Sequence, residues 1–166
     1  MDQPTQIRKA TLEEAVLIRK LALDIWPKAF EKILSPTQIA YMLELMYSET
    51  ALMNDMKRGV EFYILNVDKT DAGYAAIENI APRSYKLHKI YLSQKLHGKG
   101  LGKFLLNQME QIVLGRQATV LRLNVNRGNQ AVEFYKSRGY KIVHTEDIDI
   151  GNGFFMNDYV MEKQLH

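Results

Sequence analysis

Cysteine is absent from this chain of 166 residues, and histidine is scarce. Without a thiol, the chain can form no disulfide, no cysteine nucleophile, no thiolate zinc site and no iron–sulfur cluster. The four histidines are scattered and lack the spacing of metal ligands: His88, His97, His144 and His166. We therefore expect a mechanism that needs no metal, and a location in the cytoplasm.

Long apolar runs are also missing, since none approaches the roughly 18 residues of a membrane span. The first ten residues, MDQPTQIRKA, do not show the charged and then apolar layout of a secretory signal. No repeat, low-complexity tract or flexible linker divides the chain. With 46% hydrophobic and 25% charged residues, the composition is typical of a globular protein, and we expect one domain over residues 1–166 with no membrane contact.

Charge of one sign is missing from two stretches, although the net charge is only +3. Between Glu78 and Glu110 there is no acidic residue, and six basic residues fall there: Arg83, Lys86, Lys89, Lys95, Lys99 and Lys103. From His144 to Glu162 there is no Lys or Arg, and five acidic residues occur: Glu146, Asp147, Asp149, Asp158 and Glu162. The first stretch should attract an anion and the second could face a cation, whereas the alternative for each is a solvated face.

The hydrophobic periodicity predicts a mixed α/β protein. Strands are expected at residues 6–9, 60–67, 73–78, 85–92, 118–125, 140–150 and 154–163, and helices at 11–26, 36–47, 49–58, 100–114 and 129–138. Capping boxes at Thr11 and Ser35 begin the first two helices, and Pro27 should end the first at Trp26. This order implies a mixed sheet with helices on both faces.

One glycine-rich segment lies between a predicted strand and a predicted helix. It consists of His97, Gly98, Lys99, Gly100, Leu101, Gly102 and Lys103. Glycines let the backbone approach a ligand closely, and the helix N-terminus offers N–H groups and a positive dipole end, so the segment predicts a phosphate cradle. The motifs of a P-loop and of a dinucleotide fold are both incomplete here. The alternative is an ordinary glycine-rich turn.

A second segment, residues 129–140, begins a helix at Asn129 and has Tyr135 near its middle. A tyrosine hydroxyl is a proton donor with an ordinary pKa near 10, suited to protonating a departing thiolate. The alternative is that Phe134 and Tyr135 only pack in the core.

Together with Ile90-Tyr91-Leu92, these two segments resemble the GNAT superfamily of acetyl-CoA-dependent N-acetyltransferases over nearly the whole chain. The chain departs from the family pattern where His97 replaces Gln or Arg, and Asn129 is one residue closer to Tyr135 than in many members. The resemblance implies a mixed, mostly antiparallel sheet of about seven strands with helices on both faces, splayed in the middle to admit acetyl-CoA.

The resemblance also implies a role for each residue of the motifs. The main chain of Ile90, Tyr91 and Leu92 would bind the pantetheine arm, and residues 97–103 would hold the pyrophosphate. Asn129 would bind the pantetheine or the adenine side of the cofactor. Tyr135 would donate a proton to the leaving coenzyme A thiolate.

The general base has three candidates. His88 lies four residues before Leu92, where family members often have Glu, and a histidine with a pKa near 6.5 can accept a proton from an ammonium. Strand alternation would put His88 on the same face as Ile90 and Leu92, where it could simply be packed. Glu78, at the end of the neighbouring strand, is the second candidate, and a chain of water molecules is the third.

The acceptor side should comprise residues 26–30, residues 41–47 and the terminal hairpin. Residues 33–36 and 154–161 resemble a bacterial GNAT branch that includes spermidine/spermine acetyltransferases. We therefore expect acetyl transfer from acetyl-CoA to a primary amine by direct attack in a ternary complex, with a polyamine or other small cationic amine as acceptor.

Two further alternatives are a protein or peptide amine as acceptor, and a module that senses acetyl-CoA without turnover. Nucleic-acid binding is not expected, because the basic stretch lacks interleaved aromatic residues. Whether strand 140–150 serves in a homodimer is left open.

Overall fold

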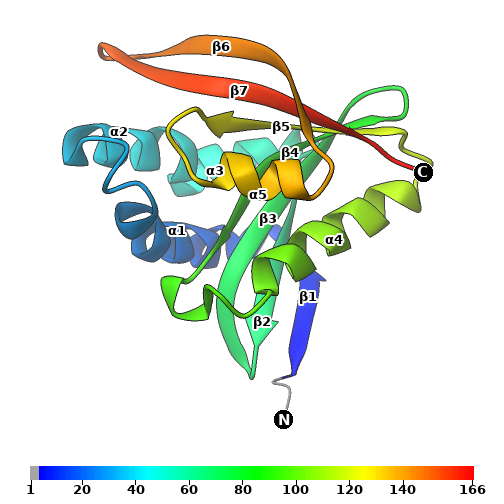
Figure 1. The fold of residues 1–166 in the computed structure, drawn as a ribbon. Helices are drawn as coiled ribbons and strands as arrows, with labels where there is room; N and C mark the ends of the chain where they lie inside the picture. Colours follow the sequence, from blue (N-terminus) through cyan, green and yellow to red (C-terminus); the bar gives the residue numbers. More distant parts are fainter. Residues whose placement is uncertain (1–3) are drawn as a thin grey trace.

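The computed structural model describes residues 4–166, which form a seven-stranded sheet in the order β1-β2-β3-β4-β5-β7-β6 (Figure 1). The strands are β1 (Thr5–Lys9), β2 (Glu61–Val67), β3 (Thr70–Ala81), β4 (Ser84–Leu92), β5 (Val120–Asn126), β6 (Lys141–Gly151) and β7 (Phe154–Gln164). Among these described strands, only β4 and β5 pair in parallel. The expected mixed, mostly antiparallel sheet is confirmed.

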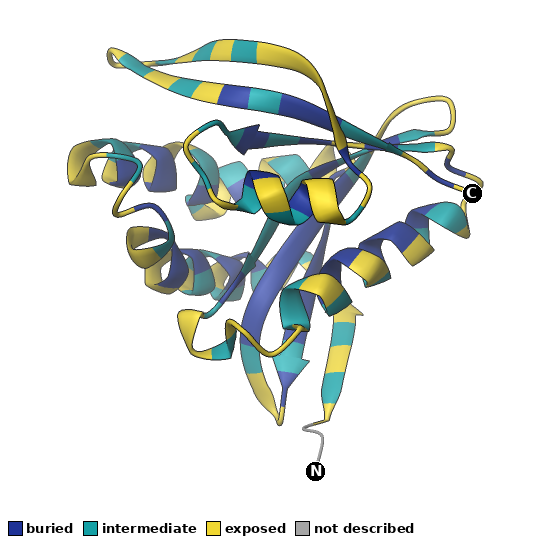
Figure 2. Cartoon of the chain, viewed as in Figure 1, coloured by how far each residue is buried: buried dark blue, intermediate teal, exposed yellow. Residues whose placement is uncertain are grey.

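Helices cover both faces of the sheet, as expected. They are α1 (Ala15–Ala29), α2 (Pro36–Tyr47), α3 (Glu49–Lys57), α4 (Leu101–Leu114) and α5 (Ala131–Ser137). The first three bury one core around Ile18, Trp26 and Tyr74, and α4 and α5 bury the other around Leu105 and Tyr140. In Figure 2, β3 is dark blue between these two cores, whereas β6 is mostly exposed. None of the helices within residues 4–166 has the length and apolar character needed to cross a membrane.

The first helix differs from its predicted end, because α1 continues through Pro27 to Ala29. Proline in a helix removes one donor to the carbonyl four residues earlier, which here belongs to Leu23. Leu23 is 47% exposed, so this carbonyl lies on the solvent side. Packing of Trp26 against Phe30, with ring centroids 4.6 Å apart, favours the extra turn.

Of the two predicted capping boxes, the one at Thr11 is complete and the one at Ser35 forms only in part. At the first, the main-chain N–H of Thr11 donates to Glu14 Oε1 over 3.1 Å. At the second, Ser35 Oγ accepts the N–H of Gln38 over 3.1 Å, but the Gln38 side chain does not return to the cap. Its Nε2 donates instead to the main-chain oxygen of Phe155, 2.8 Å away, because the hairpin lies beside α2.

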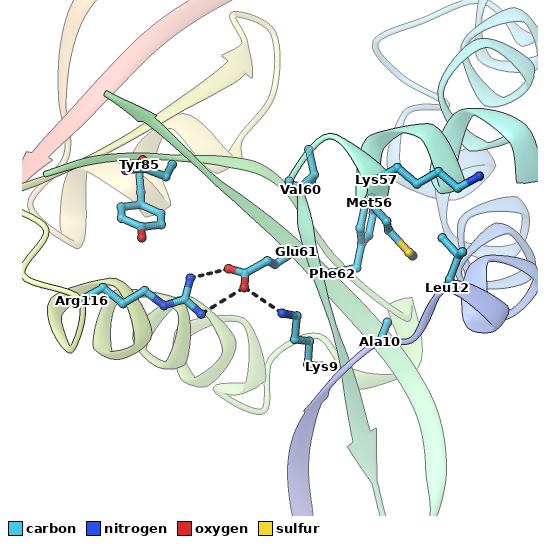
Figure 3. Close-up of a pocket in the computed structure, with 12 residues that line it drawn as sticks. Lys9, Ala10, Leu12, Met56, Lys57, Val60, Glu61, Phe62, Tyr85 and Arg116 are labelled. Carbon is cyan, nitrogen blue, oxygen red and sulfur yellow. Dashed lines mark hydrogen bonds and ion pairs between the residues drawn. The ribbon is translucent and has the colours of Figure 1, made fainter. Parts of the chain in front are cut away.

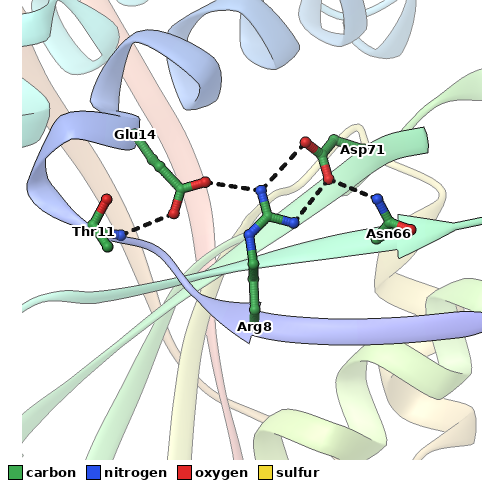
Figure 4. A network of polar contacts seen from close by, with 5 residues as sticks. All are labelled: Arg8, Thr11, Glu14, Asn66 and Asp71. Atoms are coloured by element: carbon green, nitrogen blue, oxygen red, sulfur yellow. Dashed lines mark hydrogen bonds and ion pairs between the residues drawn. The ribbon is translucent and has the colours of Figure 1, made fainter. Parts of the chain in front are cut away.

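An ion-pair network joins β1 to the rest of the sheet (Figure 4). The Arg8 guanidinium donates to Glu14 Oε2 over 2.8 Å and to Asp71 Oδ1 over 3.0 Å. Asn66 Nδ2 also donates to Asp71, over 2.9 Å. The edge strand is therefore attached both to the β2–β3 hairpin and to the turn that precedes α1.

A bulge interrupts the pairing of β4 with β3. Ala76 lies opposite Lys89 and the next residue, Ile77, lies opposite Leu87, so His88 is an extra residue. After the bulge, Ile90 packs toward α4, whereas His88 bonds to Glu78, which also contacts Arg58 after α3. The expectation that His88 shares a face with Ile90 and Leu92 is therefore wrong, because the extra residue interrupts the alternation of side chains.

The parallel pair β4–β5 separates partway along its length. Pairing runs from Ser84 opposite Val120 to Leu87 opposite Leu123 and then stops. Beyond it, residues 88–92 of β4 keep only β3 as a neighbour, and residues 124–126 of β5 keep only β7. The sheet is thus splayed in its middle, which is the separation expected from the sequence resemblance.

Candidate active site

The separation of β4 from β5 opens a cleft of about 1210 Å³. Its walls come from the end of α1, α2, the segment before α4, the start of α5, and the β6–β7 hairpin. Most of the predicted site residues line it: His88, Ile90, Tyr91, Leu92, His97, Gly98, Gly100, Leu101, Gly102, Lys103, Asn129 and Tyr135. Glu78 and Lys99 are outside this lining, although Glu78 contacts it through His88.

The glycine-rich segment has the backbone conformation expected of a cradle. Gly98 and Gly100 have φ of 81° and 76°, in the left-handed region that favours glycine, and a Cβ at either would meet no atom within 4 Å. Helix α4 begins directly after Gly100, so its free N–H groups lie beside Lys103 at the cleft. These features fit an anionic pyrophosphate.

Two predicted cofactor contacts are occupied in part by the protein itself. Nε2 of His97 lies 3.3 Å from the main-chain oxygen of Leu92, so this ring joins the segment to the end of β4. Oδ1 of Asn129 accepts the N–H of Ala131 over 2.8 Å at the start of α5. The side-chain amide nitrogen of Asn129 makes no hydrogen bond within residues 4–166 and is free to donate to a ligand.

The free edge of β4 offers main-chain groups to an extended ligand. Residues 88–92 have no partner strand on the side of β5, and they line the cleft. An unpaired strand edge presents N–H and C=O groups in a regular row. This geometry suits the amide groups of a pantetheine arm.

Tyr135 projects from α5 into the cleft and is only 8% exposed. The rings of Phe134 and Tyr140 lie against it, with centroids 5.4 and 5.7 Å away. Burial raises the pKa of Tyr135 well above its ordinary value, so the hydroxyl stays protonated at neutral pH. Tyr135 can therefore donate a proton.

His88 is held by a carboxylate. Its Nε2 lies 2.7 Å from Glu78 Oε1, and the other oxygen of Glu78 accepts from Arg58 over 2.5 Å. Burial lowers the pKa of His88, although the bond to Glu78 opposes this shift. The pKa of Glu78 is lowered in turn, since the bonds to His88 and Arg58 outweigh its burial.

This arrangement sets the tautomer of the histidine. An ionised carboxylate only accepts hydrogen bonds, so Nε2 of His88 carries the hydrogen and Nδ1 keeps its lone pair. His88 is thus neutral at pH 7 and able to accept a proton at Nδ1, and Glu78 orients the ring.

An aromatic wall supports the middle of β4 on the side of α1 and α2. Tyr91 packs against Trp26, Phe30 and Tyr74, with ring centroids 5.5 to 5.9 Å away. Within this wall Trp26 Nε1 donates to Tyr74 Oη over 3.2 Å, and Tyr74 donates to Tyr47 over 2.8 Å. The wall fixes the backbone that borders the cleft.

The β6–β7 hairpin is tied to α2 across this side of the cleft. Besides the bond from Gln38, the hydroxyl of Tyr41 donates to the main-chain oxygen of Ile150 over 2.6 Å. Gly151 has a φ of 90°, and a Cβ there would lie 2.7 Å from the Tyr41 hydroxyl. Helix and hairpin are therefore in close contact.

The acidic residues of this hairpin mostly have partners in the protein. Asp147 pairs with Arg127 over 2.6 Å, Glu162 pairs with Arg122 over 2.5 Å, and Asp149 accepts the N–H of Gly151. Of the five acidic residues in this stretch, only Asp158 lines the cleft. The acidic stretch as a whole therefore does not face the cleft, and only Asp158 could meet a cation there.

A second hollow of about 590 Å³ lies where β1, β2 and the end of α4 meet (Figure 3). Its carboxylate, Glu61, accepts from Arg116 over 2.5 and 3.1 Å and from Lys9 over 2.9 Å. These two cations lower the pKa of Glu61 despite its burial. Glu61 is thus fully engaged in joining three elements.

Nowhere in residues 4–166 do three or more His, Asp or Glu side chains gather as metal ligands would.

Comparison with known proteins agrees with this geometry. A spermidine N(1)-acetyltransferase of Thermoplasma acidophilum is 27% identical over 96% of both chains. An uncharacterized N-acetyltransferase from Lactobacillus delbrueckii subsp. lactis is 31% identical over 96% of this chain and 95% of its own length. The crystal structure of the PaiA N-acetyltransferase from T. acidophilum, solved with coenzyme A, superposes with a TM-score of 0.82 at 28% identity, covering 97% of this chain and 99% of that one.

The family model of the acetyltransferase (GNAT) domain matches residues 31–163. This match spans β2 to β7, including the splay, the glycine-rich segment and Tyr135. The resemblance expected from the sequence is thus confirmed, and so is an acyltransferase activity. The chain belongs to the GNAT family of acetyltransferases.

Proposed function

We propose that this protein transfers the acetyl group of acetyl-CoA to a primary amine by direct attack in a ternary complex. The acceptor in this proposal is a small cationic amine such as a polyamine. The observation that carries the proposal is the cleft at the splay, which brings a neutral histidine and a protonated tyrosine together beside an open strand edge.

The cleft residues fit the parts of acetyl-CoA. The N–H groups at the start of α4, with Lys103 and the nearby Lys99, bind the pyrophosphate, and the edge of residues 90–92 binds the pantetheine arm. The free amide nitrogen of Asn129 donates to the same arm or to the adenine side. Coenzyme A bound to the PaiA N-acetyltransferase supports this assignment.

Two titrating groups, His88 and Tyr135, carry out the proton transfers. Nδ1 of His88 takes a proton from the acceptor ammonium, and Glu78 stabilises the imidazolium that forms. As the amine nitrogen bonds to the acetyl carbon and the carbon–sulfur bond breaks, the hydroxyl of Tyr135 gives its proton to the thiolate. The nitrogen releases its second proton to solvent as the amide forms, and solvent returns a proton to Tyr135. Such positioned acids and bases each contribute about 10² to 10⁴-fold in rate.

A small cationic acceptor is supported by two observations. The spermidine N(1)-acetyltransferase of T. acidophilum is similar to this chain along nearly its whole length. In addition, the buried carboxylate of Asp158 lines the cleft on the side of the hairpin.

Coenzyme A release measured with a panel of amines tests this function. The panel contains spermidine, putrescine, propylamine, several amino acids and a short peptide with a free N-terminus. We expect a saturable rate with the small cationic amines. Saturation by the peptide alone would assign a protein acceptor, and acetyl-CoA binding without release for every amine would indicate a sensor.

A further inference from the structure

The point where β4 and β5 separate has polar residues on both sides. His88 follows Leu87 on β4, and Asn124 follows Leu123 on β5, immediately beyond the last paired residues. Leu123 and Val125 pack in the core of α4 and α5. Asn124 therefore points to the opposite face, which is the face of His88.

Asn124 contacts two carboxylates of the hairpin. Its Nδ2 lies 3.3 Å from Asp158 Oδ2 and 3.2 Å from Glu146 Oε2. Asp158 is 3% exposed and lines the cleft. A buried carboxylate is thus held by Asn124 just beyond the separation point, in the cleft that His88 also lines.

Asp158 has no cationic partner. Within residues 4–166 no Lys, Arg or His makes an ion pair with its carboxylate, in contrast to Asp147 and Glu162 of the same hairpin. Arg127 approaches closely, but its Nη1 donates to the main-chain oxygens of Glu146 and Asp158, not to the carboxylate.

The positive charges near Asp158, on Lys86 and Arg127, make no ion pair with its carboxylate. Burial, mainly, and the nearby charge of Glu146 raise the pKa of Asp158, while Asn124, Lys86 and Arg127 oppose the shift. Taking a carboxylate out of water without a counterion is unfavourable, and a bound cation restores the lost interaction.

We propose that the carboxylate of Asp158, held by Asn124, binds the ammonium group of the acceptor amine. This inference rests on the proposed acetyltransferase function and adds a residue that determines acceptor binding. Asp158 and His88 lie on the same face of the sheet and line the same cleft, so an ammonium bound at Asp158 enters the cleft that holds the proposed base. Asp158 thus binds and orients the acceptor, whereas His88 and Tyr135 carry the protons.

Two lysines that line the cleft, Lys86 and Lys89, make no ion pair with Asp158. Nζ of Lys89 lies 5.3 Å from the ring centroid of Tyr47 and 5.7 Å from that of Phe62, so its charge is held by aromatic faces. Lys86 lies on β4 and makes no ion pair with Asp158, but its charge lowers the pKa of that carboxyl and so favours the ionised form. Neither lysine therefore pairs with the carboxylate of Asp158, which stays available to a bound cation.

The decisive variant is Asp158→Asn, which keeps the shape of the side chain and its hydrogen bond to Asn124 but removes the charge. We expect KM for the best amine of the panel to rise roughly tenfold or more, with KM for acetyl-CoA within about twofold of wild type. Asp158→Glu should recover part of the lost affinity. The matched control is Asp149→Asn, an exposed residue of the same hairpin whose bond to Gly151 an asparagine can keep.

An equal amine KM in Asp158→Asn and wild type would overturn the inference, as would equal rises in both KM values. Thermal stabilisation of the coenzyme A complex by each amine provides a readout that needs no turnover. Wild type should be stabilised by the amine and Asp158→Asn should not; a shift that survives in the variant, or no shift with any amine in wild type, contradicts the role. If only the proposed acetyl transfer is wrong, the amines should still bind through Asp158, but no coenzyme A should be released.

Discussion

At the scale of single residues, burial leaves His88 and Tyr135 in the protonation states that the proposed base and acid need at the same pH. Burial raises the pKa of Tyr135 and lowers that of His88, so the first is protonated and the second is neutral near pH 7. The same physical cause acts in opposite directions because the charged form is the deprotonated one for tyrosine and the protonated one for histidine.

Replacing Tyr135 by Phe removes the proton donor and little else. We expect kcat to fall by roughly 10² or more while the dissociation constant of coenzyme A stays unchanged. Rapid mixing with a thiol reagent measures the first, and calorimetric titration measures the second. Tyr159→Phe, which removes a hydroxyl from β7 outside the cleft lining, serves as the control, and equal rates in the two variants would contradict the assignment.

Protonation of His88 should produce the acid limb of the pH–rate profile. As pH falls through the pKa of His88, which lies below 6.5, the ring becomes protonated and can no longer accept a proton, so kcat/KM for the amine should decline. His88→Gln should lower the rate and abolish this limb. A limb that persists in the variant would return the role to Glu78 or to water.

Glu78 is expected to act on that limb through His88. The hydrogen bond and charge of Glu78 raise the pKa of His88 against its burial. Glu78→Gln should therefore move the acid limb to lower pH, with kcat reduced because the imidazolium loses its stabilising charge. A profile that keeps its midpoint would show that Glu78 has only a structural role.

At the scale of elements, the start of α4 depends on glycine for its conformation. Gly100→Ala forces an alanine to a φ of 76° but creates no clash, so we expect a loss of about 1 kcal/mol in stability and a higher KM for acetyl-CoA. Gly153→Ala in the β6–β7 turn has nearly the same geometry, with a φ of 79° and equal space. Urea unfolding should show similar losses for both variants, while only Gly100→Ala should affect the cofactor.

Most elements could be predicted from local sequence patterns, because periodicity, caps and glycines act over a few residues. The bulge at His88 could not, since it depends on the register of β4 against β3. The side chain of Gln38 was likewise expected at its own cap, but a distant carbonyl on Phe155 attracts it.

The same limit applies to the candidate site. The glycine-rich segment and Tyr135 carry recognisable motifs, and the structure brings them to one cleft. Asp158 stood out only as one of five acids in a run, and nothing in the run indicates which one turns inward. Its burial arises from the pairing of β5 with β7, a contact between segments far apart in the chain.

At the scale of the whole molecule, the Arg8 network attaches the edge strand. The bonds from Arg8 lower the pKa values of Glu14 and Asp71. Because these values are depressed in the folded state, the stabilisation is complete above the ordinary carboxyl pKa and is lost as pH falls through the folded values.

Arg8→Ala should therefore lower the free energy of unfolding by about 1 kcal/mol at pH 7, a modest figure because Arg8 is 42% exposed. The difference from wild type should shrink when unfolding is measured below about pH 4. Lys20→Ala, at an exposed position of α1, is the control. A difference that stays constant with pH would show that packing, not charge, accounts for the loss.

The contact between α2 and the hairpin has a consequence for how this side of the cleft can vary among related proteins. Tyr41 reaches the hairpin so closely that residue 151 has no room for a side chain. A larger residue at 151 would displace the Tyr41 hydroxyl, besides straining a φ of 90°, so the two positions are expected to change together. The spacing between α2 and the hairpin then depends on a pair of residues that lie far apart in the chain.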